Sequence, residues 1–369
     1  MKLSKSKYSI GSLFSGVGGF ELGFKKAGYL TKWAVENDPF AAITYKLNFK
    51  NTLIEQDINK ITNKEISNLN SVDVITAGFP CQAFSIAGYQ RGFEDPRGNL
   101  FLEILRFVKK LETKPKILLL ENVRNFYSHD NKNTWATIRT YLKKSGYSYI
   151  PLIVNTSSST GIPQNRERAY IVCFLNDKTY INDPINLVNK KNLLMAQQNS
   201  FDLYGSRAER FLNNLTKNFL EEKKDYKDFL EPEKNIDDKY SYSINEFKTV
   251  ARSGDTITEE LKKKASNDSF VYQWRRVGEV RINKSNEVPT LTASMGSGGH
   301  NVPIVNQKTN IRKLTPRECF NFQGFPRTFK LPNNVADNQL YKQSGNSVTV
   351  KLVAKIASSI KKELDIDGF

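Results

Sequence analysis

The sequence predicts an α/β fold in which an open, mostly parallel sheet has helices on both faces, accompanied by a second, smaller domain. Apolar stretches alternate with helical patterns through the first 145 residues, which is typical of parallel strands joined by crossover helices. The length of 369 residues is enough for a large domain and one smaller domain. In such a fold, ligands bind at the carboxyl ends of the strands.

Each element follows from a local pattern. Strands are predicted near residues 8–14, 30–36, 52–56, 72–77 and 117–121, and helices at 19–28, 38–49, 99–112 and 132–145. The apolar run Ala169–Leu175 predicts a buried strand that carries Cys173 as a structural residue. From about 183 to 288 charge runs replace this alternation. We therefore expect a first domain at 1–182, a second at 183–300, and a return to the first at 301–369.

A glycine turn follows the first predicted strand and opens the first helix. It reads Phe14-Ser15-Gly16-Val17-Gly18-Gly19, and glycines there allow a ligand to approach the backbone closely. Glu36 follows about 20 residues later at the end of the second strand, where a carboxylate can bind ribose hydroxyls. The spacing differs from the dinucleotide fingerprint, and no Lys-Ser/Thr pair of a phosphate loop follows. The pattern favours an adenosyl cofactor without a phosphate chain.

A cysteine lies directly behind a proline at the end of the fourth predicted strand, in Gly78-Phe79-Pro80-Cys81-Gln82. A thiolate is a strong nucleophile, and nearby amide and guanidinium groups can lower the pKa of a cysteine in such a loop. A lone cysteine is more often a small buried apolar residue. The loop by itself leaves both interpretations open.

Six motifs in order along the chain resemble those of bacterial DNA (cytosine-5)-methyltransferases of the small restriction-modification type. The resemblance covers residues 8–175 and 289–360 and implies a Rossmann-like S-adenosylmethionine-dependent methyltransferase sheet, with a target recognition domain as the second domain. The motifs are Phe14-Ser15-Gly16-Val17-Gly18-Gly19, Gly78-Phe79-Pro80-Cys81-Gln82, Glu121-Asn122-Val123, Gln164-Asn165-Arg166-Glu167-Arg168, Arg317-Glu318-Cys319 and Gly345-Asn346-Ser347-Val348.

The resemblance implies four catalytic residues that act on a cytosine flipped out of duplex DNA. Cys81 would add to carbon 6, because carbon 5 is otherwise too weak a nucleophile to take a methyl group from a sulfonium. Glu121 would supply a proton to N3 of the ring. Arg168 would bond the base carbonyl, and Arg166 a phosphate or the nucleophile loop. We expect a water molecule to remove the carbon-5 proton.

The resemblance also implies the S-adenosylmethionine site. Phe14 would stack on the adenine, Glu36 would bind the ribose, and Asn346 would reach the methionine end. The other expected contacts are Gly16, Gly18, Gly19, Asn37, Asp57, Ile58, Pro80, Leu100, Ser347 and Val348. Ser12 departs from the family pattern, because many relatives have an acid just before Leu-Phe.

Double-stranded DNA is the expected partner, and two segments are expected to act on it. Residues 85–95 have the length and glycine content of a lid that closes after base flipping. Gln273, Arg275 and Arg276 combine an amide with arginines, and arginine bidentate to guanine is the commonest specific contact. This arrangement is similar to that of relatives that methylate palindromes starting with CC, such as CCGG, CCNGG or CCWGG; the alternative is a basic strand that holds phosphates. The expected DNA contacts are Gln82, Ser85, Ala87, Gln90, Arg91, Gln273, Arg275, Arg276, Thr290, Gly298 and Gly299.

Composition limits the class further. A net charge of +17 is expected of a protein that binds a polyanion. No apolar run reaches the ~20 residues of a membrane span and no signal peptide is evident, so we expect a cytoplasmic protein that acts as a monomer on DNA. Three dispersed cysteines and two histidines predict no metal. Two alternatives remain open, a tRNA cytosine-5 methyltransferase of the same superfamily and a catalytically inactive DNA-binding relative.

Overall fold

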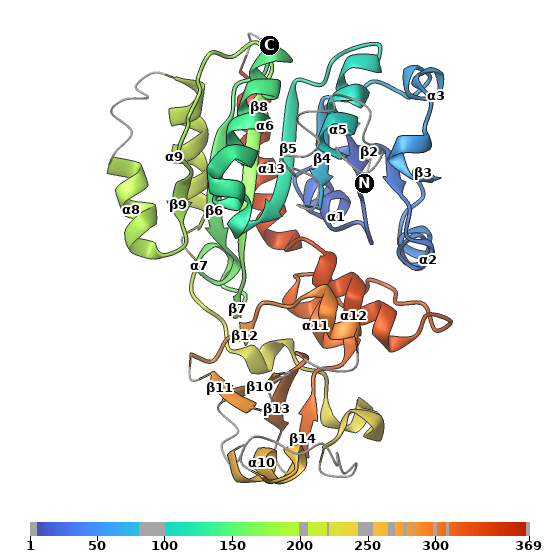
Figure 1. Cartoon of the computed structure of the whole chain (residues 1–369), viewed down its shortest axis with the longest axis vertical. Coiled ribbons are helices and arrows are strands. Elements are labelled where there is room, and N and C mark those ends of the chain that lie inside the picture. Colours follow the sequence, from blue (N-terminus) through green and yellow to red (C-terminus); the bar gives the residue numbers. More distant parts are fainter. Residues whose placement is uncertain are drawn as a thin grey trace. The chain divides into compact units, whose positions relative to one another are not determined.

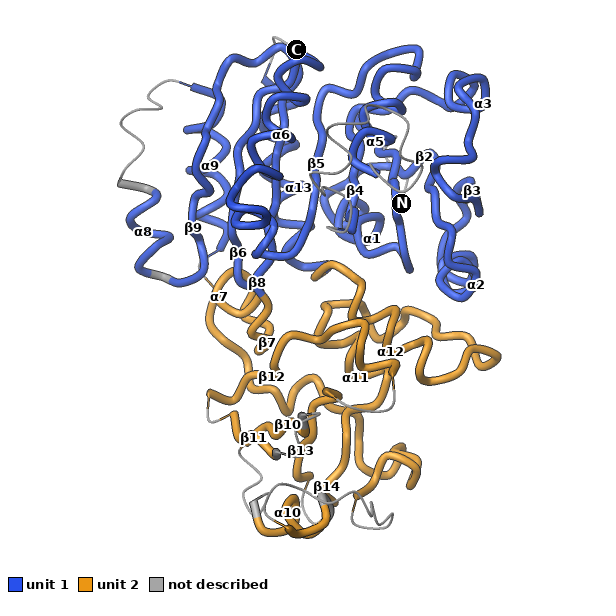
Figure 2. The backbone as a smooth tube through the Cα atoms, in the orientation of Figure 1, with its two compact units in different colours: residues 1–155, 167–220, 350–369 blue, residues 156–166, 221–349 orange. Residues whose placement is uncertain are grey.

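The fold is seen in a computed structural model (Figure 1). The structure describes residues 6–80, 100–198, 206–219, 221–242, 254–264, 270–275, 279–283, 285–297, 301–307 and 310–366. By their internal contacts the residues form two compact units (Figure 2). Unit 1 comprises residues 1–155, 167–220 and 350–369, and unit 2 comprises residues 156–166 and 221–349.

Unit 1 is built on an eight-stranded sheet of order β3-β2-β1-β4-β5-β8-β6-β9. The strands from β3 to β5 run parallel, and β8 runs antiparallel to both of its neighbours, β5 and β6. The predicted alternation of strands and helices is therefore confirmed. The strands are β1 (Ser9–Leu13), β2 (Leu30–Glu36), β3 (Thr52–Glu55), β4 (Val74–Gly78), β5 (Ile117–Val123), β6 (Ile150–Asn155), β8 (Glu167–Phe174) and β9 (Ile185–Leu187).

Helices cover both faces of this sheet. On one face α5 (Leu100–Lys110) and α6 (Asn133–Lys144) share an apolar core with alternate residues of the strands, such as Ile75 and Leu118. On the other face α1 (Gly19–Lys26) packs against α13 (Val350–Leu364), which in turn contacts α9 (Arg207–Phe219). The remaining helices of unit 1 are α2 (Pro39–Asn48), η1 (Ile58–Lys60), α3 (Asn63–Ser67), η3 (Arg124–Tyr127), η4 (His129–Lys132) and α8 (Lys190–Gln198).

Unit 2 contains a four-stranded antiparallel sheet of order β11-β10-β13-β14 and a short parallel pair, β12-β7. Its strands are β7 (Gln164–Asn165), β10 (Val271–Arg275), β11 (Glu279–Asn283), β12 (Val288–Pro289), β13 (Pro303–Gln307) and β14 (Asn310–Lys313). Its helices are α7 (Thr156–Thr160), η6 (Tyr226–Phe229), η7 (Glu233–Asn235), η8 (Asp238–Tyr240), α10 (Ile257–Lys264), η9 (Ala293–Gly296), α11 (Pro316–Phe322) and α12 (Asp337–Asn346).

The unit boundaries differ from the predicted domain boundaries. Residues 183–219, assigned from their charge runs to the second domain, contact unit 1, and residues 301–349 belong to unit 2. The reason is that β9 pairs with β6, while α9 buries an apolar stripe that includes Phe211 and Leu215. An amphipathic helix must cover such a stripe, whatever the charge on its other face.

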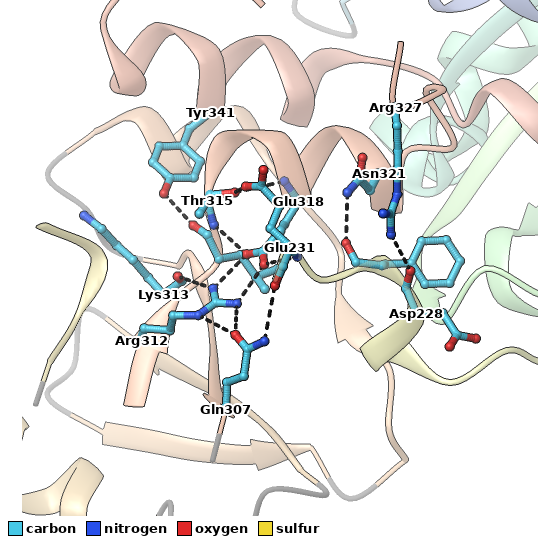
Figure 3. A network of polar contacts seen from close by, with 12 residues as sticks. Asp228, Glu231, Gln307, Arg312, Lys313, Thr315, Glu318, Asn321, Arg327 and Tyr341 are labelled. Carbon is cyan, nitrogen blue, oxygen red and sulfur yellow. Dashed lines mark hydrogen bonds and ion pairs between the residues drawn. The ribbon is translucent and has the colours of Figure 1, made fainter. Parts of the chain in front are cut away.

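A buried ion pair connects β14 to α11 in unit 2 (Figure 3). Arg312 and Glu318 are both 0% exposed, and two guanidinium nitrogens reach the two carboxylate oxygens at 2.7 and 2.8 Å. The Glu318 carboxylate also accepts from the Thr315 backbone N–H at 2.8 Å, which closes a capping box at the start of α11. Gln307 accepts from Arg312 as well. The Arg317-Glu318-Cys319 motif thus lies in a helix fixed by a satisfied network.

Among the described residues, no helix combines the length and the apolar character needed to cross a membrane.

Candidate active site

The carboxyl ends of β4 and β5 lie side by side, with Gly78 opposite Glu121 in the parallel register. A Cβ atom at Gly78 would come within 3.3 Å of the Glu121 carboxylate, so glycine permits this close approach. The chain leaves β4 through Phe79 and Pro80 toward Cys81. Cys81 itself lies outside the described residues, as do Gln82, Ser85, Ala87, Gln90 and Arg91.

Glu121 and Arg168 form an ion pair at this edge of the sheet. Arg168 on β8 lies opposite Val123 on β5, so its side chain shares a face with that of Glu121, two residues earlier. The Arg168 Nε atom is 3.2 Å from Glu121 Oε1, and the two side chains are 14% and 12% exposed. The structure therefore brings together two of the four predicted catalytic residues.

The neighbouring residues hold Arg168 in place. Its Nη1 atom donates to the Glu167 carbonyl at 2.8 Å. The Glu167 carboxylate forms an ion pair with Arg124, which follows β5 directly, so a second cross-strand contact lies next to the first. The Glu167 carbonyl thereby limits the positions that the Arg168 guanidinium can take.

Asn122 is a positioning residue that the sequence analysis did not single out, although it lies inside the Glu-Asn-Val motif. Its side chain is 4% exposed and donates to the carbonyl of Phe79 at 2.9 Å, while its oxygen accepts from the Val123 N–H at 2.8 Å. Phe79 packs its ring against Phe101 and Phe126. The backbone two residues before Cys81 is thereby tied to β5.

Cys173 and Cys319 are both buried, and burial raises the pKa of each thiol. A thiol that resists ionisation is a poor nucleophile. The prediction that Cys173 is structural is confirmed by its place inside β8, where it is 0% exposed.

Arg166 is buried within unit 2. Its side chain is 2% exposed, and it donates to the carbonyls of Leu291 at 2.6 Å, Gly345 at 3.2 Å and Ser347 at 2.7 Å. Contact of Arg166 with a phosphate or with the nucleophile loop stays a prediction, because residues 81–99 lie outside the described part of the chain. Residues 166 and 168 carry similar side chains, but Arg166 belongs to unit 2 and stabilises a turn there, whereas Arg168 belongs to unit 1.

That turn is the predicted cofactor segment Asn346–Val348. Gly345 precedes it, and a Cβ atom there would lie 2.1 Å from the backbone carbon of Thr292, so only glycine fits. Ser347 and Val348 are buried, and the Ser347 N–H donates to the Ser344 carbonyl at 3.3 Å. The segment is well fixed within unit 2, and its contact with a cofactor stays a prediction.

The glycine turn at the end of β1 has backbone conformations that explain its composition. Gly16 and Gly18 have φ values of 54° and 90°, and a Cβ atom on Gly18 would lie 2.1 Å from the Phe49 ring. Phe14 also has a positive φ, 55°, which is uncommon for a bulky residue. Gly18 is the N-cap of α1, so the turn presents the first amides of that helix.

Glu36 holds the glycine turn together. Its carboxylate accepts from the backbone N–H groups of Gly16 at 2.7 Å, Asn37 at 3.0 Å and Asp38 at 2.8 Å. Burial raises the pKa of Glu36, an effect that these three hydrogen bonds oppose. Each carboxylate oxygen has two lone pairs, so Glu36 can hold the turn and still accept from one ribose hydroxyl.

Two predicted cofactor contacts, Asp57 and Ile58, lie at the start of the short helix η1. Asp57 is its N-cap and accepts from the Asn59 N–H at 2.9 Å, while Ile58 is buried. Arg106 on α5 donates to the carbonyls of Ile58 and Ile61, both at 2.8 Å, which fixes η1 against the helix that Leu100 begins.

Two of the predicted DNA-contacting side chains are already bonded within unit 2. The Gln273 amide donates to the Asn301 carbonyl at 3.2 Å, and the Thr290 hydroxyl donates to the Asn165 carbonyl at 2.6 Å. The Arg275 side chain and residues Arg276, Gly298 and Gly299 lie outside the described part of the chain. Base reading by this segment therefore stays a prediction. Within the described ranges, no cluster of three or more His, Cys, Asp or Glu side chains could hold a metal ion.

Residues 8–362 match the family of C-5 cytosine-specific DNA methylases. The type II methyltransferase M.Bsp6I of Bacillus sp. (strain RFL6) is 43% identical over 357 residues, which cover 96% of this chain and 99% of the relative. The type II methyltransferase M.HhaI of Haemophilus parahaemolyticus is 33% identical, with 97% and 95% covered.

Solved structures share the fold. A mutant of Spodoptera frugiperda DNMT2 superposes with a TM-score of 0.65 at 20% identity, covering 97% of this chain and 99% of that one. The Dnmt2 methyltransferase of S. pombe gives a TM-score of 0.64 at 20% identity, covering 98% and 100%. With the glutamate–arginine pair beside the end of β4, the family match leads to one conclusion: the chain belongs to the C-5 cytosine-specific DNA methylases and is a DNA cytosine-5 methyltransferase.

Proposed function

We propose that this protein is the modification enzyme of a restriction-modification system. On this proposal it flips a cytosine out of duplex DNA and transfers a methyl group from S-adenosylmethionine to carbon 5 through a covalent Cys81 adduct. The family match and the type II methyltransferase relatives support the reaction. The observation that carries the site is the Glu121–Arg168 pair beside the end of β4.

S-Adenosylmethionine fits the residues at the carboxyl end of β1. The positive φ values of Gly16 and Gly18 open the backbone to a ligand, and Glu36 retains a lone pair for one hydroxyl group. The Ser15 hydroxyl is buried and has no hydrogen-bond partner among the described residues, as expected beside a polar ligand. When bound, the cofactor supplies a methyl group on a positively charged sulfur.

Cys81, as a thiolate, would form a bond to carbon 6 and raise the electron density at carbon 5. Glu121 would deliver a proton to N3, which neutralises the charge that this addition places on the ring. Arg168 would move part of its hydrogen bonding from Glu121 to the base carbonyl. The Glu121 carboxylate would then be less stabilised, so Glu121 would be protonated more easily. Carbon 5, activated by the addition of Cys81, would then accept the methyl group that the cofactor supplies. Loss of the carbon-5 proton to water, elimination of the Cys81 thiolate and return of the N3 proton to Glu121 would restore the aromatic ring and the enzyme.

The adduct gives the decisive test. A duplex that carries 5-fluorocytosine at the target should trap Cys81 covalently, because fluorine cannot leave as the proton does. The Cys81→Ala variant should give no adduct and no methyl transfer, yet should retain most of its duplex affinity, which comes mainly from phosphates. The measurements are denaturing electrophoresis, labelled methyl transfer and a binding titration. Turnover by Cys81→Ala would refute the mechanism.

Duplex DNA and tRNA are compared in the same assay, because a tRNA cytosine-5 methyltransferase would use the same nucleophile. We expect methyl transfer to DNA alone. Methyl transfer to tRNA alone would show that the proposal is wrong and that the chain is a tRNA cytosine-5 methyltransferase. Sequencing of 5-methylcytosine in DNA from a methylation-free host that expresses this chain gives the target site. We infer a palindrome that starts with CC.

We assign target recognition to unit 2 and base reading to the segment from Gln273 to Arg276. If Arg276 reads a guanine, its alanine variant should lose roughly 1–3 kcal/mol on the cognate site alone. A phosphate contact would weaken cognate and random DNA equally and reduce the salt slope by about one. We also propose that the enzyme acts in the cytoplasm and that it binds DNA as a monomer. Sedimentation of the complex measures how many copies are bound.

A further inference from the structure

A carboxyl group with no role in the reaction described above is buried at the start of α1. Glu21 is the third residue of this helix, directly after the glycine turn, and is 1% exposed. Buried glutamates are rare unless they are paired with a cation or fully hydrogen-bonded. Glu21 directly follows the glycine turn, where we expect the cofactor to bind, so its charge lies close to that expected site.

Polar groups from three further elements surround the Glu21 side chain. The Tyr45 hydroxyl of α2 is 3.4 Å from Glu21 Oε1 and is also bonded by the Asn51 amide at 2.8 Å. Ser12 of β1 faces the same side and accepts from Thr76 of β4 at 3.0 Å. The other carboxyl oxygen, Oε2, is buried and has no hydrogen bond of ordinary length from a described residue.

No positive charge from a described residue offsets the Glu21 carboxyl group. Burial raises the pKa of Glu21 to about 7, its own N–H and the Ser12 and Tyr45 hydroxyls oppose that rise, and the nearby Glu36 carboxylate adds to it. Burial likewise raises the pKa of Glu36. Among the described residues no lysine or arginine pairs with Glu21. Two buried carboxyls thus flank the glycine turn, and a cation bound there would stabilise both as carboxylates.

We propose that the Glu21 carboxylate determines specificity for the charged form of the cofactor: its negative charge favours S-adenosylmethionine over uncharged adenosyl ligands. The inference rests on the proposed function, since it needs an adenosyl ligand at the glycine turn. The Glu36 carboxylate accepts from three backbone N–H groups. One carboxyl oxygen of Glu21 has no hydrogen-bond partner among the described residues, so the negative charge of Glu21 is less compensated than that of Glu36. In a partly polar interior, one unit charge shifts the affinity for a nearby cation by about tenfold.

The test compares two ligands with one isosteric variant of the full-length protein. Calorimetric titration at pH 8, where most of the Glu21 side chain is ionised, measures the affinity for S-adenosylmethionine and for uncharged 5′-methylthioadenosine. Glu21→Gln should bind S-adenosylmethionine about tenfold more weakly and 5′-methylthioadenosine almost as well as before. Glu112→Gln, which removes the same charge from an exposed position outside these contacts, is the matched control and should change neither affinity.

Two outcomes would overturn the inference. Equal losses for both ligands would show that Glu21 only packs the glycine turn, and unchanged affinities would show that its charge is not felt by the ligand. Glu21→Asp keeps the charge and should retain the preference for S-adenosylmethionine, which guards against a folding defect in the glutamine variant. Failure of the unmodified protein to bind S-adenosylmethionine would instead refute the proposed cofactor.

Discussion

Two arginine–glutamate pairs in this chain have opposite surroundings. Arg312 and Glu318 in unit 2 are fully buried, joined by two short hydrogen bonds, and supported by Gln307 and by the capping box of α11. Glu121 and Arg168 in unit 1 are partly exposed and are joined by a longer contact of 3.2 Å. The first pair is saturated and serves the fold, whereas the second belongs to the proposed active site.

The largest expected effect comes from breaking the saturated pair. Arg312→Ala leaves the Glu318 carboxylate buried without its cation, and the free energy of unfolding should fall by about 3–5 kcal/mol. Urea denaturation measures this change. Arg327→Ala, which removes an exposed contact to the Asp228 carbonyl near the same network, is the control and should change stability by less than about 0.5 kcal/mol (Figure 3). Similar values for the two variants would contradict the structural role of the pair.

The active-site pair should respond in the opposite sense. Glu121→Gln removes the acid that donates to N3, so kcat for methyl transfer should fall by about 10²–10⁴-fold. Because glutamine has the shape of glutamate and can still accept from Arg168, the free energy of unfolding should fall by less than in Arg312→Ala, by about 1.5–3 kcal/mol. Single-turnover kinetics and urea denaturation of one preparation test both statements. A stability loss as large as that of Arg312→Ala would erase the distinction.

Glu21 extends the comparison to a buried carboxyl without a cation. Its pKa of about 7 in the folded protein exceeds its ordinary value of 4.5, so its contribution to stability is complete below pH 4.5 and is lost as the pH rises through 7. The difference corresponds to at most about 3 kcal/mol. Urea denaturation at pH 5 and pH 8 should show a loss in the unmodified protein that Glu21→Gln lacks. Equal pH profiles would mean that Glu21 titrates normally.

Most of unit 1 could be predicted because its signals are local. The apolar character of Ile117–Leu120 is enough to predict a buried strand. The glycine at position 18 is enough to predict a tight turn. The helix α9 was missed because its apolar stripe lies within a charged segment, and only the contact with α13 shows where that stripe belongs.

The contacts of individual side chains were harder to predict than the elements. Arg166 and Arg168 look equivalent in the sequence, but one meets the carbonyls of a distant turn and the other meets Glu121. The partner of Arg312 and the enclosure of Glu21 likewise depend on residues brought together only by the fold. Long-range packing, which no local pattern encodes, decides which of several similar residues lies beside Glu121.

The smallest effect concerns the outer pair, Arg124 and Glu167, beside the active site. Arg124 is 53% exposed, so its ion pair with Glu167 should contribute only about 0.2–1 kcal/mol to stability. Glu167 also presents the carbonyl that Arg168 bonds, so Arg124→Ala should loosen the Arg168 guanidinium slightly and lower kcat by a few-fold, with little change in duplex affinity. Single-turnover rates and a DNA titration over several salt concentrations separate the two possibilities. A loss of affinity with a reduced salt slope would show that Arg124 contacts a phosphate, and the outer pair would then belong to DNA binding rather than to the positioning of Arg168.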